Sequence, residues 1–156
     1  MARLDARRVA AWRGLQARVG EVERAIDAAL REEWDISLAW FDVLAALQRA
    51  GGAARPGEIA GEIGLPVSSL SRRLDRLEED GWVVRRRPAR AVDHRAVEVV
   101  LTRRGRNLWR AMNVTYRRAV QAEFAVGLGD GQVAILHEVI DHLTPEPPVP
   151  VESDDE

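Results

Sequence analysis

The chain has 156 residues, of which 46% are hydrophobic, enough for one domain with a buried core. It has no cysteine, which excludes a disulfide framework, a zinc site built on thiolates and a thiol redox sensor. The formal net charge of −2 argues against a nucleic-acid partner, but five of the 25 acidic residues lie in residues 145–156, and without them the charge is +3.

The sequence carries no sign of a membrane protein. No apolar run approaches the length that spans a bilayer, and the N-terminus lacks the apolar stretch of a signal peptide. We therefore expect a soluble, cytoplasmic protein with no membrane partner. Residues 145–156 are rich in proline and acids, and we expect a disordered tail there, either inert or discouraging nonspecific contact with DNA.

The first 49 residues predict two helices of different kinds. In the first, apolar residues recur every three or four positions, which is typical of a helix packed along other helices. These residues are Trp12, Leu15, Val19, Val22, Ile26 and Ala29. Ser37 to Arg49 is apolar nearly all round, so we expect a buried helix that joins the helical bundle to the next part of the chain.

Residues 56–81 predict a helix-turn-helix. A short helix over 56–64 ends in a tight turn at Gly64 and Leu65, and a second helix follows over about 66–80, with Pro66 in its first turn and Gly81 at its end. At 100° per residue, one face of the second helix is apolar and the opposite face carries hydroxyls and guanidiniums. The apolar face holds Val67, Leu70, Leu74 and Leu77; the polar face holds Ser68, Ser69, Arg72 and Arg76, flanked by Ser71 and Arg73.

The segment that follows predicts a basic hairpin, or wing, over about 82–101. Trp82 to Val84 begins one strand, and the alternating residues 97–101 form the returning strand. Arginines crowd the connection, and residues 72–106 hold 11 arginines against six acids. Guanidiniums of this kind are inserted into narrow minor grooves of DNA. Together these features predict a winged helix-turn-helix that binds duplex DNA; the alternatives are an ordinary amphipathic surface helix and a solvated loop.

The remaining sequence predicts two more helices. Thr102 is placed to cap a long helix in which small and apolar residues recur with the same period, a break follows over 127–131, and a third helix extends to Leu143. Helices from both ends of the chain therefore flank the hairpin lobe. A two-fold dimer interface would use this much apolar surface, whereas a self-contained three-helix bundle is the alternative.

Three segments of the sequence resemble the MarR family of bacterial transcriptional regulators. They are SLAWFDVLAAL, GEIAGEIGLPVSSLSRRLDRLEEDGWVVR and DHRAVEVVLTRRGR, within a resemblance that covers about residues 8–143. The resemblance implies an obligate homodimer that binds a palindromic operator, and for many members a repressor released by small phenolic or other aromatic anions.

The expected architecture is mainly α (α+β), with a winged helix-turn-helix lobe and a helical dimerisation bundle built from both termini. We expect a dimerisation helix over 1–36, the DNA-binding lobe over 37–101, dimerisation helices over 102–144 and the tail over 145–156.

The resemblance also assigns DNA-contacting residues to positions of this sequence. On the recognition helix, the second helix of the helix-turn-helix, these are Ser68, Ser69, Ser71, Arg72 and Arg76, and on the wing they are Arg90, Asp93 and Arg95. Arg73, which flanks the polar face, is a further candidate for DNA contact. In the family pattern the wing aspartate orients the arginine that enters the minor groove. The segment 89–92 loosens the usual spacing here, so either Arg90 or Arg95 could be the inserted residue.

An effector site is expected in the cleft between the dimerisation helices and the DNA-binding lobe. Its candidates are three tryptophans that could line a pocket and two arginines that could pair a carboxylate: Trp12, Trp34, Trp40, Arg13 and Arg86. Tryptophans in such positions are more often core or interface residues.

No cofactor, metal or catalytic site is expected, because the three histidines show no metal-binding spacing and no nucleophile elbow is present. The functional alternative is a winged helix that makes only protein contacts.

Overall fold

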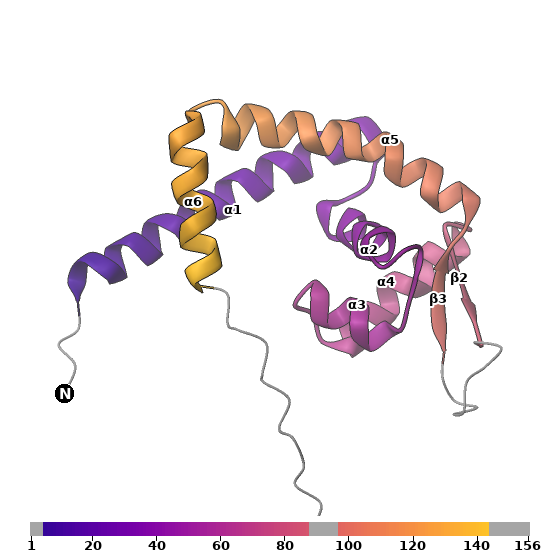
Figure 1. Cartoon of the computed structure of the whole chain (residues 1–156). Helices are drawn as coiled ribbons and strands as arrows, with labels where there is room; N and C mark the ends of the chain where they lie inside the picture. The colour runs from indigo at the N-terminus through magenta and orange to yellow at the C-terminus, as the bar shows by residue number, and fades with distance from the viewer. Residues whose placement is uncertain (1–4, 88–96, 144–156) are drawn as a thin grey trace, which may run out of the picture.

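A computed structural model describes residues 5–87 and 97–143 of the chain. Two long helices, α1 and α5, lie side by side, and a small lobe hangs beneath one end of the pair (Figure 1). The predicted mainly helical fold with a small antiparallel sheet is confirmed. In chain order the elements are α1 (Ala6–Trp34), α2 (Leu38–Arg49), β1 (Ala53–Ala54), α3 (Pro56–Glu62), α4 (Val67–Glu79), β2 (Val83–Arg86), β3 (Glu98–Leu101), α5 (Arg103–Val120), a π-helical turn η1 (Gln121–Ala125) and α6 (Asp130–Leu143).

The core of the molecule forms around α2, as its composition predicts. Phe41, Leu44 and Leu47 are buried, and so are three further residues of this 12-residue helix. α2 contacts α1 and α5 on one side and α3, β1 and β3 on the other. The helix therefore joins the long helices to the lobe, and burying its apolar residues against both parts is the main force that holds them together.

Only half of the predicted apolar stripe of α1 is covered. Ile26 and Leu30 are buried where the C-terminal half of α1 lies against α5. Leu15 and Val19 are exposed, although they belong to the same periodic stripe. The period predicts which residues share a face, but it cannot say how far along the helix a partner reaches.

The helix-turn-helix is present with two differences from the sequence prediction. Pro66 precedes the second helix as its cap, with ψ 141°, and α4 begins at Val67. Leu70, Leu74 and Leu77 are buried as predicted, but Val67 is 49% exposed. Val67 occupies the first helical position, one turn ahead of Leu70, where the helix extends past the core. Gly81 ends the segment with φ +72°, a conformation that costs glycine little.

A three-stranded antiparallel sheet closes the lobe in the order β1-β3-β2. The hairpin strands are those that the alternation predicts, with Val83, Val99 and Leu101 buried. β1 is not predicted by the sequence, because two alanines show no strand period. Its pairing of Ala53 with Val100 attaches the end of α2 to the hairpin.

The start of α5 is fixed on the turn between α4 and β2. The Thr102 hydroxyl accepts a hydrogen bond from the backbone N–H of Gly105 at 3.0 Å, as the predicted cap requires, and donates one to the Gly81 carbonyl at 2.8 Å. A Cβ on Gly105 would lie 2.0 Å from the carbonyl oxygen of Trp82. Glycine at position 105 is therefore a packing requirement, since only a residue without a side chain lets the helix approach this closely.

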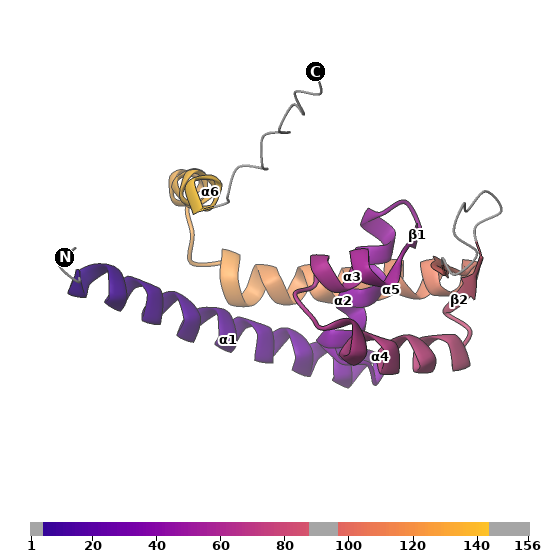
Figure 2. The same cartoon turned by 90° about the horizontal axis from the view of Figure 1, so that it is seen from below.

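Beyond the π-helical turn, α6 stands away from the other elements (Figure 2). No residue of α6 is buried, although the helix carries apolar residues such as Ile135 and Val139. Among the described residues, no helix is both long and apolar enough to cross a membrane.

Candidate nucleic-acid interface

The outward face of α4 carries the hydroxyls and guanidiniums that the sequence predicts. Ser68, Ser69 and Ser71 are exposed, as are Arg72 and Arg76. The three buried leucines hold the opposite face against the lobe, so the polar face projects away from it. This is the arrangement by which a recognition helix presents donors to base edges and phosphates in a major groove.

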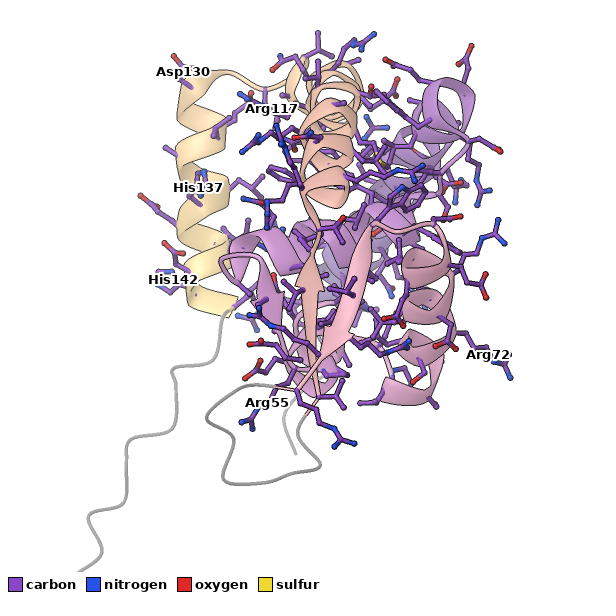
Figure 3. The ribbon with its side chains drawn as sticks, turned by 90° about the vertical axis from the view of Figure 1, so that its right-hand side faces the viewer. Arg55, Arg72, Arg117, Asp130, His137 and His142 are labelled. Carbon is purple, nitrogen blue, oxygen red and sulfur yellow. The ribbon has the colours of Figure 1, made fainter. Side chains whose placement is uncertain are left out.

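The three arginines of α4 are not equivalent. Arg72 points away from the lobe (Figure 3). Its guanidinium makes no hydrogen bond or ion pair with any described residue. Arg76 lies 3.4 Å from Asp80 and 3.7 Å from Glu79, so it must leave or share these carboxylates to meet another anion. Of the three arginines, Arg72 is therefore the one whose guanidinium is available to bind an anion such as a DNA phosphate.

Arg73 is directed toward the protein instead. It is half-buried, and its guanidinium donates a hydrogen bond to the carbonyl of Ala39 in α2 at 3.1 Å. The bond ties the recognition helix to α2. The sequence placed Arg73 at the edge of the polar face, and its helical angle alone could not show that it turns inward.

Two further arginines of the lobe were missed by the sequence analysis. Arg55 is exposed at the start of α3, at the lower end of the molecule in Figure 3. Arg85, on β2, forms ion pairs with Asp75 and Glu78 of α4, each at 2.6 Å. A sequence signal for Arg85 existed, since the acids are three apart and share a helix edge, but which arginine reaches them depends on the fold.

The wing residues assigned from the sequence, Arg90, Asp93 and Arg95, lie outside the described residues. The strands that lead to them are described. β2 and β3 pair from Val83↔Leu101 to Arg86↔Glu98, and Arg86 and Glu98 form an ion pair at 3.1 Å. The base of the wing is therefore attached to the sheet and, through Arg85, to the recognition helix.

Comparison with known proteins shows that the winged helix-turn-helix resembles that of one family of regulators. The sequence model of the MarR family matches residues 34–96, which include α2, the helix-turn-helix and β2. A curated relative, the HTH-type transcriptional regulator PecS of Dickeya dadantii (strain 3937), is 38% identical over 86 residues. That match covers 54% of this chain and 50% of PecS, so it spans half the length of the relative.

Solved structures extend the similarity to most of the chain. A single-site mutant of MarR from E. coli, complexed with operator DNA, is 25% identical with a TM-score of 0.76, and the alignment covers 92% of this chain and 100% of that one. The chain is thus similar to MarR-family proteins in the sequence of residues 34–96 and in its overall fold. Sco3205, a MarR-family regulator from Streptomyces coelicolor solved in complex with DNA, shares the fold at 24% identity, with a TM-score of 0.80 over 92% of this chain and 89% of that one.

The proteins that this chain resembles are transcriptional regulators, and two of the similar structures were solved in complex with DNA.

The effector residues expected from the sequence do not lie together within one chain. Trp12 and Trp34 lie 22 positions apart on α1, which corresponds to roughly 33 Å along a helix. The Trp34 indole N–H donates a hydrogen bond to the Thr115 hydroxyl at 2.9 Å, and Arg86 pairs with Glu98. Trp12 and Arg13 are exposed on the uncovered half of α1.

Trp40 does line a cleft, at the boundary between α1 and the helix-turn-helix lobe. The cleft has a volume of about 470 Å³. Two tryptophans and two arginines stand on its walls beside two aspartates. The lining residues are Arg31, Asp35, Ile36, Ser37, Trp40, Arg76, Asp80 and Trp82.

A half-buried carboxylate on α2, that of Asp42, was also missed by the sequence analysis. Burial raises the pKa of Asp42 above its ordinary value of 3.8; Arg49 and Arg73 oppose this rise and Glu23 adds to it. Asp42 lies on a separate surface hollow between α1 and α2. No metal-binding group of three or more histidines or acids occurs among the residues that the structure describes.

Proposed function

We propose that the protein acts as a homodimer in the cytoplasm and binds a palindromic operator with two copies of α4. The observation that carries the proposal is the outward face of α4, where three buried leucines hold the exposed serines and Arg72 away from the core. Two such helices about 34–36 Å apart enter successive major grooves on one side of the duplex. Arg72 or Arg76 reads a guanine, while the serines and the wing arginines Arg90 and Arg95 contact phosphates.

Selection of random duplexes with the purified protein tests sequence recognition directly. A palindromic consensus with half-sites about one helical turn apart supports the proposal. On that duplex, Arg72→Ala should lower affinity by about 1–3 kcal/mol and relax the preference at one base position. Arg117→Ala removes the same charge from α5, far from the lobe (Figure 3), and should change affinity little. Enrichment of no sequence would favour the alternative, a winged helix that makes only protein contacts.

The dimer is supported by apolar surface that the single chain leaves uncovered. Val9, Trp12 and Leu15 are exposed on α1, and Ile135 and Val139 on α6. Exposed apolar faces on helices from both ends of the chain favour an interface in which a second copy covers them.

Sedimentation measures this assembly. Val139→Glu should produce monomers, because it places a charge on the apolar face of α6. His137→Glu adds the same side chain at an exposed position about 160° away around the helix and should leave the dimer intact. A wild-type protein that sediments as a single chain at micromolar concentration would contradict the dimer.

We propose further that the protein is a repressor, released when a small aromatic anion binds the cleft beside Trp40. A ring can lie against Trp40 or Trp82, while a carboxylate pairs with Arg31 or Arg76. Arg76 also belongs to the outward face of α4, so a ligand that holds this arginine lowers DNA affinity by as much as it favours the state without DNA. Salicylate should quench tryptophan fluorescence and weaken operator binding, and neutral benzyl alcohol should do neither. No response to salicylate would remove the effector site.

A further inference from the structure

The edge of α4 that faces the wing carries negative charge close to the proposed DNA-binding face. Asp75 and Glu78 lie three positions apart and therefore project from the same side of the helix. Carboxylates left free at this place would repel the phosphates that Arg72 and the serines are expected to approach. The recognition helix therefore needs a cation on this edge that does not itself leave for DNA.

Arg85 supplies that cation through a network of hydrogen bonds. One terminal nitrogen of its guanidinium donates to Glu78 at 2.6 Å, and the other donates to Asp75 at 2.6 Å and to the Ser71 carbonyl at 3.4 Å. The backbone N–H of Arg85 donates to the second oxygen of Glu78 at 2.8 Å. A single strand residue thus engages three residues along one edge of α4.

The surroundings of Arg85 differ from those of its neighbours in the Arg85–Arg87 run. Its side chain is 27% exposed, whereas that of Arg86 is 60% exposed and pairs only with Glu98 among the described residues. The pKa of Glu78 is held below its ordinary value of 4.5, first by the hydrogen bond from the Arg85 backbone and then by the guanidinium, although partial burial opposes both. The Arg85 guanidinium is therefore engaged within the protein before any DNA arrives.

Arg85 also stands where the wing begins. It pairs with Val99 in the hairpin, and β2 ends one residue later. Its bonds to α4 fix β2, the first strand of the wing, against the recognition helix.

We propose that Arg85 is a positioning residue: it neutralises Asp75 and Glu78, sets the wing relative to α4, and thereby determines the preference for operator over other duplexes. The inference rests on the proposed DNA-binding function. A lysine cannot replace Arg85, because a single ammonium group does not match the two separate carboxylates that the planar fork bridges.

The experiment compares the affinities of the full-length protein for the selected operator and for a scrambled duplex of equal length. The variants are Arg85→Lys, Arg85→Gln and the double variant Asp75→Asn/Glu78→Gln, with Arg87→Gln as the matched control from the same arginine run. We expect the operator-to-scrambled ratio to fall about tenfold in the first three, as for the loss of one charge-assisted hydrogen bond, and to stay unchanged in the control. The double variant keeps every arginine, so it tests the positioning role if the Arg85 variants fold poorly.

Two results would overturn the inference. The first is the pattern expected if Arg85 contacts phosphate instead. Arg85→Gln then lowers affinity equally for both duplexes and reduces the salt slope, and Arg85→Lys behaves as wild type. The double variant then binds both duplexes more tightly, with an unchanged operator-to-scrambled ratio. If the pKa of Glu78, measured by NMR on the protein without DNA, is the same in wild type and Arg85→Gln, the network is absent. A wild-type protein with no preference between duplexes removes the proposed function and the inference together, whereas a wild-type preference that survives all three substitutions removes the inference alone.

Discussion

Replacing Gly105 by alanine should test whether the start of α5 is fixed on the turn between α4 and β2. The added Cβ would lie 2.0 Å from the carbonyl oxygen of Trp82 and 2.9 Å from its carbonyl carbon. Ordinary van der Waals contact begins at about 3.4 Å, so the helix or the turn must move by more than about 1 Å. Both are backbone, and neither can give way as a flexible side chain would.

The size of the effect follows from three contributions. Overpacking of this kind costs about 1–3 kcal/mol. The movement also breaks the hydrogen bond between the Gly105 N–H and Thr102, a cap worth about 1 kcal/mol. Alanine returns about 1 kcal/mol through its better helix propensity. The expected net loss is about 2 kcal/mol, which lowers Tm by about 4–8 °C in a chain of this length.

Calorimetry or circular dichroism at a fixed protein concentration measures this loss. Gly61→Ala is the matched control, because Gly61 also lies in a helix and a Cβ there would meet nothing within 4 Å. That variant should be neutral or stabilised by up to about 1 kcal/mol. If Gly105→Ala melts within about 1 °C of the wild type, the close approach of α5 to Trp82 does not limit stability and the reasoning fails.

Three other substitutions test the electrostatics and polar contacts of the fold. Asp42→Asn should raise the free energy of unfolding at pH 7. Because burial raises the folded-state pKa of Asp42, the stability of the wild type falls as pH rises from 3.8 through that pKa. Urea melts of variant and wild type should therefore converge below about pH 3.8. Glu78→Gln should act in the opposite direction: its folded-state pKa is lowered, so the stabilisation is present above 4.5 and lost as pH falls through the folded pKa, and a variant equal to wild type at pH 7 would contradict this. Trp34→Phe should cost about 1 kcal/mol in thermal melts, because it removes the bond to the Thr115 hydroxyl at 2.9 Å; no loss would show that the indole N–H finds water equally well.

The candidate interface was predictable in part, because helical spacing carries much of the information. The polar face of α4 follows from the positions of its apolar residues. Of these, the three leucines are buried as predicted and Val67 is not. The same spacing placed Arg72 on the polar face and Arg73 at its edge, but it could not show that Arg73 turns inward. Arg73 differs because α2 places the carbonyl of Ala39 within its reach, and α2 is remote in sequence.

The role of Arg85 shows the same limit from another direction. Three consecutive arginines at positions 85–87 look alike in the sequence, and a basic hairpin is all that their composition predicts. The strand register determines that the first of them faces α4 and meets two acids there. A side chain in a strand changes face at every residue, so neighbours in the sequence acquire different environments.

The amino-acid pattern was enough to predict the order and type of nearly every element, the burial of α2, the caps at Gly81 and Thr102, and the hydroxyl-and-guanidinium face of α4. Those features depend on periodicity and backbone preference, which act within a few residues. Three-dimensional packing was needed to show which arginines form ion pairs within the protein and that Gly105 must lack a side chain. It was also needed to show that two alanines form a strand, and that apolar residues of α1 and α6 are exposed. These features arise from contacts between residues far apart in the chain, and local sequence patterns do not predict such contacts.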